Sequence, residues 1–118
     1  MEIDPPEVVA EVRREFMRYE QAIFCDDPRT IRYGGAETLY GYDAIKAFRA
    51  GRSLAGLART LAQTVITAYG RDVAVASTLF RLPTAPGKVG RQMQIWVRFA
   101  NGWRVVAAHV SVIDEGAP

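Results

Sequence analysis

Two strand-like runs meet at a tight turn in the stretch Arg91-Gln-Met-Gln-Ile-Trp-Val-Arg-Phe-Ala-Asn-Gly-Trp-Arg-Val-Val-Ala-Ala-His-Val-Ser-Val-Ile113. Asn101-Gly102 lies between the runs, and both residue types tolerate the positive φ angles that a two-residue type I′ turn requires. The flanking runs are rich in Val, Ile and aromatic residues, which favour strands. The stretch therefore predicts a long antiparallel hairpin.

The turn also predicts the register of this hairpin. With the Asn-Gly pair as its two loop residues, Gln94 would pair with His109 and Gln92 with Ser111. Because side chains alternate across a strand, these polar residues would share one face. The opposite face would carry Met93, Ile95, Val97, Val106, Ala108, Val110 and Val112. We expect the apolar face to line the interior of the fold and the polar row to face a partner subunit.

The composition is typical of one globular domain. The chain has 118 residues, within the usual range of about 100–150 for a domain, so we expect residues 1–118 to form one unit. Fifteen Lys and Arg against thirteen Asp and Glu give a net charge of +2, too small to indicate a nucleic acid partner. With one cysteine, no secretory signal and no apolar run long enough for a membrane span, a cytoplasmic protein without an internal disulfide is expected.

The first part of the chain predicts a helix that begins at a cap. Asp4 can cap, Pro5 suits the first helical position, and Glu7 completes a capping-box-like spacing. The helix should continue to about Phe24. Its apolar stripe is Val8, Val12, Phe16, Tyr19 and Ile23.

Short strands and a second helix should follow, and then long strands. The strands are expected at residues 29–33 and 36–40, with Arg32 on the same side as Thr30. A helix from Tyr42 to Ala50 should end at Gly51. Long strands at residues 58–69 and 72–82 would precede the hairpin. This order predicts an α+β domain with its helices on one face of a sheet. A second copy of the chain is the simplest cover for the other face, so we expect a homodimer through the sheet.

Seven segments resemble the AtzH-like proteins of the nuclear transport factor 2-like superfamily, which also contains SnoaL-type cyclases and ketosteroid isomerase. The segments are Arg18-Tyr-Glu-Gln-Ala22, Asp27-Pro-Arg-Thr-Ile-Arg-Tyr-Gly34, Leu39-Tyr-Gly-Tyr42, Ala47-Phe-Arg-Ala50, Gly56-Leu-Ala-Arg59, Gly90-Arg-Gln-Met-Gln94 and Gly102-Trp-Arg-Val-Val-Ala-Ala-His-Val-Ser111. The resemblance implies a cone-like, curved antiparallel β-sheet with N-terminal helices packed on its concave face. It departs at one place: family members usually have a short second helix where residues 23–25 run almost directly into Asp26-Asp27.

The family resemblance also implies a function. AtzH-like proteins are associated with amidase partners in ureide and cyanuric acid breakdown, and the implied reaction removes a carboxyl group from a dicarboxylated urea to give allophanate, without a cofactor. Tyr19 and Arg32 match the implied catalytic pair. An Arg fork can hold a substrate carboxylate, and a Tyr hydroxyl can donate a proton to the leaving nitrogen. The other expected substrate-binding residues are Tyr33, Tyr42, Phe48 and His109.

Structural interpretations of these residues stay open. Tyr19 could form a hydrogen bond within the core, and Arg32 could form an ion pair with Asp27 or Glu37. His109 is the only histidine, and a dimer interface would suit it as well as a pocket. Because the chain has no second histidine and no clustered carboxylates, we expect no metal site.

Other functions are also possible. No carboxylate falls on an inward strand position, which disfavours the proton transfer of a ketosteroid isomerase. The chain could instead be a non-catalytic ligand-binding module that serves an amidase, because domains of this superfamily often lose their chemistry. It could also be a structural oligomerisation domain, since the ending His109-Val-Ser111 resembles that of kinase association domains.

Overall fold

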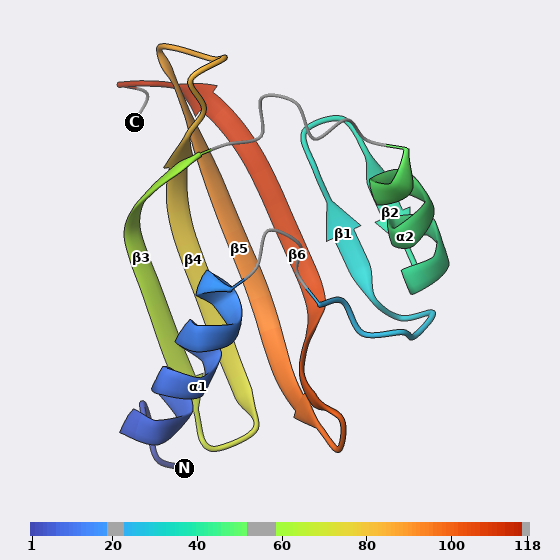
Figure 1. Cartoon of the computed structure of the whole chain (residues 1–118), viewed down its shortest axis with the longest axis vertical. Helices are drawn as coiled ribbons and strands as arrows, with labels where there is room; N and C mark the ends of the chain where they lie inside the picture. Colours follow the sequence, from blue (N-terminus) through green and yellow to red (C-terminus); the bar gives the residue numbers. More distant parts are fainter. Residues whose placement is uncertain (19–22, 52–58, 117–118) are drawn as a thin grey trace.

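The computed structural model describes residues 1–18, 23–51 and 59–116. In chain order, its elements are α1 (Pro6–Met17), β1 (Ile31–Tyr33), β2 (Thr38–Tyr40), α2 (Tyr42–Ala50), β3 (Thr60–Tyr69), β4 (Val73–Arg81), β5 (Lys88–Phe99) and β6 (Gly102–Asp114). The strands form one curved, six-stranded sheet in the order β2-β1-β6-β5-β4-β3 (Figure 1). Neighbouring strands are antiparallel, except that β1 and β6 are parallel. The predicted α+β architecture is confirmed.

Both helices pack on the concave face of the sheet, which we call the inner face. α1 buries Val8, Val12 and Phe16 against β3 and β4, so the predicted stripe is confirmed for these residues. Ile45 of α2 joins the same core. The strands contribute Ile66, Ala68, Ala74, Ala76, Trp96, Trp103, Val105 and Ala108. α2 has the predicted bounds, with Gly51 as its C-cap.

The start of α1 differs from the prediction in its cap. The N-cap residue is Pro5, and no side chain caps the helix. Asp4 instead adopts a φ of 55°, and its Oδ1 accepts a hydrogen bond from the Ala68 backbone N–H at 2.8 Å. Asp4 therefore joins the N-terminus to β3 rather than capping α1.

The chain leaves α1 earlier than predicted. The helix ends at Met17, and residues 19–22, including Tyr19, lie outside the described residues. Residues 23–25 run beside β6, because Val105 N–H donates to the Ile23 carbonyl at 2.8 Å and Cys25 N–H donates to the Val105 carbonyl at 2.9 Å. These pairings take up the backbone groups that a helix would use. Consistent with the short connection, residues 23–30 contain no helix.

The turn of the final hairpin is displaced from the predicted position. Phe99 pairs with Gly102, so the loop residues are 100 and 101. Gly102 has a φ of 111°, a conformation that glycine adopts without strain. A β-bulge interrupts the pairing between Ile95 and Trp96. A bulge adds one residue to one strand, which moves all later residues of that strand to the other face.

The bulge reverses the predicted inner and outer faces of β5, but not those of β6 beyond the bulge. Gln94 pairs with Ala108 rather than His109, and Gln92 pairs with Val110. Both glutamines are buried on the inner face, whereas His109 is exposed. The outer face of the hairpin carries Arg91, Met93, Ile95, Ala107, His109 and Ser111. The expectations that Met93 and Ile95 line the interior and that the glutamines face a partner are therefore wrong. On β6, Ala108 lies on the inner face and His109 on the outer face, as predicted.

The outer face of the whole sheet is largely apolar. Its exposed large side chains include Tyr33, Tyr40, Val65, Tyr69, Val73, Met93 and Ile95. A single chain leaves this surface in contact with solvent. Across the described residues, no helix is both long and apolar enough to cross a membrane.

Candidate functional site

Polar side chains interrupt the apolar inner face at one end. Arg32, Thr78, Gln92 and Gln94 are buried, with exposed fractions of 8%, 3%, 5% and 1%. Gln94 on β5 lies opposite Ala108 of β6, which in turn lies opposite Arg32 of β1. Gln92 lies opposite Thr78 of β4. Burying such groups destabilises a fold unless they are hydrogen-bonded, so a cluster of them in a small domain marks a candidate site.

Arg32 is the charged member of this cluster. Its Nη1 donates to Glu37 Oε1 at 2.5 Å, and its guanidinium carbon lies 5.4 Å from the centre of the Phe48 ring. The ion pair proposed for Arg32 is therefore present with Glu37, whereas Asp27 binds Arg29. A guanidinium has five N–H donors. Within the described part of the chain, the bond to Glu37 is the only one that Arg32 makes to a side chain.

Glu37 is held in place from two sides. A Cβ atom at Gly34 would lie 1.8 Å from Glu37 Oε1, so glycine there leaves room for the carboxylate. The Ala36 N–H donates to Glu37 Oε2 at 3.3 Å. Burial raises the pKa of the Glu37 carboxyl, but the hydrogen bond and charge of Arg32 outweigh this and the pKa is lowered overall. Glu37 is therefore ionised at neutral pH and tied to Arg32.

A second guanidinium reaches the inner face from the other edge of the sheet, where β3 lies. Arg59 precedes β3, and its Nη1 donates to Gln92 Oε1 at 2.8 Å. Its guanidinium carbon lies 5.3 Å from the centre of the Phe80 ring. Trp96 Nε1 donates to Gln94 Oε1 at 3.0 Å, which fixes the orientation of that amide. The site thus combines guanidinium and amide groups, which suit a ligand that bears carboxylates.

The structure brings together some of the predicted site residues. Arg32 and Phe48 are in contact on the inner face. Tyr42 lines a separate cavity of about 440 Å³ between α2 and residues 23–24, together with Ile45 and Arg49. Tyr19 lies outside the described residues, so its position relative to Arg32 stays a prediction.

Two of the predicted substrate-binding residues lie on the outer face. Tyr33 pairs with His109 across β1 and β6, and their rings meet edge-on at 6.0 Å between centres. The Tyr33 hydroxyl is 2.8 Å from the Tyr40 hydroxyl, and this hydrogen bond raises the pKa of Tyr33. The sheet separates this cluster from Arg32, so the fold does not bring Tyr33 and His109 to the inner-face site.

Sequence reasoning missed the roles of Gln92, Gln94 and Arg59. The predicted register places the glutamines at a partner interface, and Arg59 enters the prediction only through the family resemblance of the Gly56-Leu-Ala-Arg59 segment. One signal was available. Gln92, Gln94 and Trp96 alternate along β5, and a tryptophan in such a row favours burial of its whole face.

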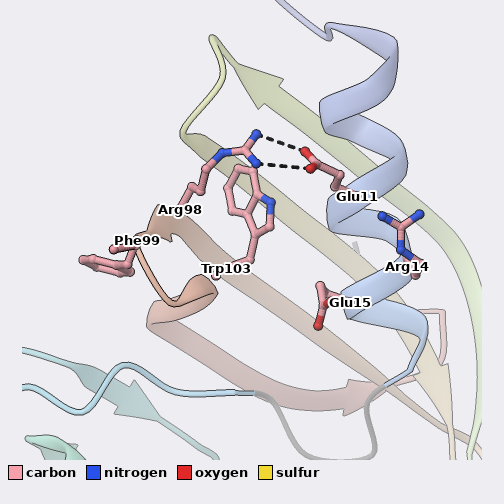
Figure 2. Close-up of a pocket in the computed structure, with 8 residues that line it drawn as sticks. Glu11, Arg14, Glu15, Arg98, Phe99 and Trp103 are labelled. Carbon is pink, nitrogen blue, oxygen red and sulfur yellow. Dashed lines mark hydrogen bonds and ion pairs between the residues drawn. The ribbon is translucent and has the colours of Figure 1, made fainter.

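A second concave region lies between α1 and the β5–β6 turn (Figure 2). It has a volume of about 320 Å³ and is lined by Glu11, Arg14, Glu15, Arg98 and Trp103, among others. Arg98 donates two parallel hydrogen bonds to Glu11, at 3.1 and 3.0 Å, and two more to the Arg71 carbonyl. The hydrogen bond from Arg98 lowers the pKa of Glu11. Because these bonds occupy the Arg98 donors, we interpret the region as a clamp between α1 and β5.

Few groups in the site could hold a metal ion. Within the residues that the structure describes, no three His, Cys, Asp or Glu side chains lie close enough together to do so. Glu37, the carboxylate nearest Arg32, is engaged by that guanidinium.

Solved structures share the fold of this chain. A protein with unknown function from Pectobacterium atrosepticum is 47% identical, with 95% of each chain covered and a TM-score of 0.90. A cystatin-like fold protein from Burkholderia xenovorans is 40% identical, with 100% of this chain and 99% of that chain covered and a TM-score of 0.91. A putative ketosteroid isomerase from Parabacteroides distasonis is 12% identical, with 79% and 72% covered and a TM-score of 0.62.

The sequence itself matches a family model over nearly its whole length. No curated protein matches the sequence. The AtzH-like model matches residues 1–116, and solved structures described as nuclear transport factor 2-like share the curved sheet and its helices. The chain therefore belongs to the AtzH-like family and has the nuclear transport factor 2-like fold.

Proposed function

We propose that this protein is a decarboxylating amidohydrolase of nitrogen-compound catabolism in the cytoplasm, which converts 1,3-dicarboxyurea to allophanate. The observation that carries the proposal is the burial of Arg32, a residue that is 8% exposed and whose guanidinium lies on the inner face beside polar groups. An arginine in such a place can hold a substrate carboxylate through two parallel hydrogen bonds. Membership of the AtzH-like family supports the same substrate class.

The proposed reaction needs one proton. Arg32 holds a carboxylate of the substrate, and its contact with Phe48 orients the guanidinium plane. A proton passes to the urea nitrogen that bears the departing carboxyl group. The bond from nitrogen to the carboxyl carbon then breaks, its electron pair stays on nitrogen, and the ionised carboxyl group leaves as CO₂. The donor that has lost its proton takes one back from water. Tyr19 is the proposed proton donor, because a tyrosine hydroxyl is protonated at neutral pH.

The chemistry of the side chains on the inner face also supports a second function. Arg32, Arg59, Gln92 and Gln94 can bind a carboxylate, but none of them is a base at neutral pH. A non-catalytic module that binds a small carboxylated ligand and serves an amidase partner would use the same groups. The two functions differ in one measurable respect, which is turnover by the isolated protein.

We also propose that the outer face binds a second copy of the chain. Exposed apolar side chains on neighbouring strands, such as Met93, Ile95 and Val73, form a surface of the kind that soluble monomers rarely expose. A twofold pairing of this face would bury it against itself. His109 and Tyr33 would then lie at the interface between the two copies. This location would also suit a structural oligomerisation domain.

The test is incubation of the purified protein with 1,3-dicarboxyurea while allophanate and CO₂ are measured. Tyr19→Phe should lower kcat by about 10²–10⁴-fold if the hydroxyl donates the proton. Arg32→Ala should lower kcat/KM by about 100-fold or more through loss of charge-assisted hydrogen bonds. Arg29→Ala removes an arginine whose side chain is 89% exposed and should change neither value.

The outcomes separate the functions. Turnover that neither Tyr19→Phe nor Arg32→Ala affects would refute the assigned roles. Absence of turnover by the folded parent protein, with binding of a carboxylated ligand that depends on Arg32, would establish the accessory module in place of the enzyme.

A further inference from the structure

The two inner-face arginines lie on opposite sides of the β5 glutamines. In the strand order, β6 lies between β1 and β5, and β4 lies between β5 and β3. Arg32 on β1 is therefore two strands from β5, or about 10 Å across the sheet. Arg59 enters from the β3 side and already reaches Gln92 on β5. Arg32 and Arg59 thus lie on either side of the same β5 glutamines.

The position of Arg59 is defined by contacts from several elements. Gln92 on β5 accepts a hydrogen bond from its Nη1, and Phe80 on β4 lies beneath its guanidinium plane. Phe80 can occupy this place because Gly90 opposite it has no side chain. A Cβ atom at Gly90 would lie 2.1 Å from the Phe80 ring. The packing of Phe80 against Gly90 and the hydrogen bond to Gln92 together hold the Arg59 guanidinium over the inner face.

We propose that Arg59 is a second carboxylate-binding residue of the same site, so that the preferred ligand is a small dicarboxylate held by Arg32 at one end and Arg59 at the other. The identity of the reaction rests on the proposed function, but the two-ended binding does not. A planar guanidinium binds a carboxylate through two parallel bonds, which a glutamine or lysine at the same position does not reproduce.

Two-ended binding also distinguishes substrate from product. Removal of one carboxyl group from a dicarboxylated urea leaves a product with a single carboxylate. That product can engage only one of the two arginines at a time, so it binds more weakly and leaves the site. Arg59 is thus a specificity-determining residue.

The test is a calorimetric titration with glutarate and pentanoate. Glutarate separates its two carboxylates by three chain atoms, as 1,3-dicarboxyurea does, and pentanoate has the same chain length with one carboxylate. The parent protein should bind glutarate about 10- to 100-fold more tightly than pentanoate. Arg59→Gln should remove this preference and leave pentanoate affinity within about threefold. Arg59→Lys, which keeps the positive charge without the planar guanidinium, should retain only part of the preference for glutarate.

Arg81→Gln is the matched control. Arg81 pairs with Thr60, the residue after Arg59, but its side chain is exposed and bound to Glu115. This variant should keep the full preference for glutarate. A parent protein that does not distinguish glutarate from pentanoate would overturn the proposal, as would an unchanged preference in folded Arg59→Gln and Arg59→Lys.

Hydrolysis of 1,3-dicarboxyurea by the same preparations separates this proposal from the proposed function. A preference for glutarate that depends on Arg59, in a protein without turnover, would support the dicarboxylate site and refute the enzyme. Equal kcat/KM values for the parent and Arg59→Gln would support the enzyme and refute the role of Arg59.

Discussion

Replacing Arg32 with leucine removes the cation of the inner-face ion pair and leaves Glu37 in place. The Arg32 and Glu37 side chains are 10% and 21% exposed. Exposed ion pairs contribute about 0.2–1 kcal/mol, whereas removal of one partner from a fully buried pair costs about 3–5 kcal/mol. Because this pair lies between these limits, we expect Arg32→Leu to lower the free energy of unfolding by about 2 kcal/mol.

Urea unfolding followed by circular dichroism measures this loss. For a domain of this size, about 2 kcal/mol corresponds to a fall in Tm of about 6–12 °C. Adding Glu37→Gln should recover part of the loss, because the unpaired carboxylate is then neutral. Arg81→Leu is the control and should cost less than about 1 kcal/mol, since both partners of its ion pair are half exposed. A loss below about 0.5 kcal/mol for Arg32→Leu, or full additivity with Glu37→Gln, would refute the reasoning.

Three further predictions concern the outer face, the packing near Arg59 and the response to acid. Ile95→Glu places a charge on the outer face and should convert the proposed homodimer to a monomer, and an unchanged mass in light scattering would contradict this. Gly90→Ala should lower the free energy of unfolding in urea by about 1–3 kcal/mol, because its Cβ would overlap the Phe80 ring; stability equal to the parent would contradict the close packing. The lowered pKa of Glu37 means that its ion pair stabilises the fold above about pH 4.3, and that this stability is lost as pH falls through the lowered folded-state pKa. In thermal unfolding from pH 6 to 2, the Tm of the parent should therefore fall more steeply with acid than that of Glu37→Gln. Equal slopes for the two proteins would contradict the contribution of the Glu37 ion pair.

Local signals in the sequence predicted the elements that depend on neighbouring residues. α2 has the predicted bounds because glycines lie on both sides of an apolar stripe, and Gly41 with a φ of 92° precedes the helix. Arg32 lies on the same side of β1 as Thr30, as the alternation predicted, and both are buried. These features need no knowledge of distant parts of the chain.

Features that depend on distant contacts were not predictable in the same way. The bulge between Ile95 and Trp96 is not marked by a glycine or proline, yet it decides which residues of β6 face inward. The hydrogen bond between Arg59 and Gln92 joins residues 33 positions apart. The predicted end of α1 is too late because residues 23–25 form backbone hydrogen bonds with β6, and the helical pattern does not reveal this alternative pairing.

The division of the inner face explains how the fold tolerates a polar site. α1 packs over the half of the sheet nearest the β3–β4 turn (Figure 1), where Ala68, Ala74 and Val105 are fully buried. Gln92 and Thr78 lie farther along β5 and β4, beyond this apolar half. Small residues beneath α1 let the helix approach the sheet and concentrate the apolar contacts that stabilise the domain. Polar side chains at the other end can then be arranged around a ligand with little loss of that packing. The apolar packing beneath α1 and the proposed ligand site therefore occupy separate halves of one curved sheet.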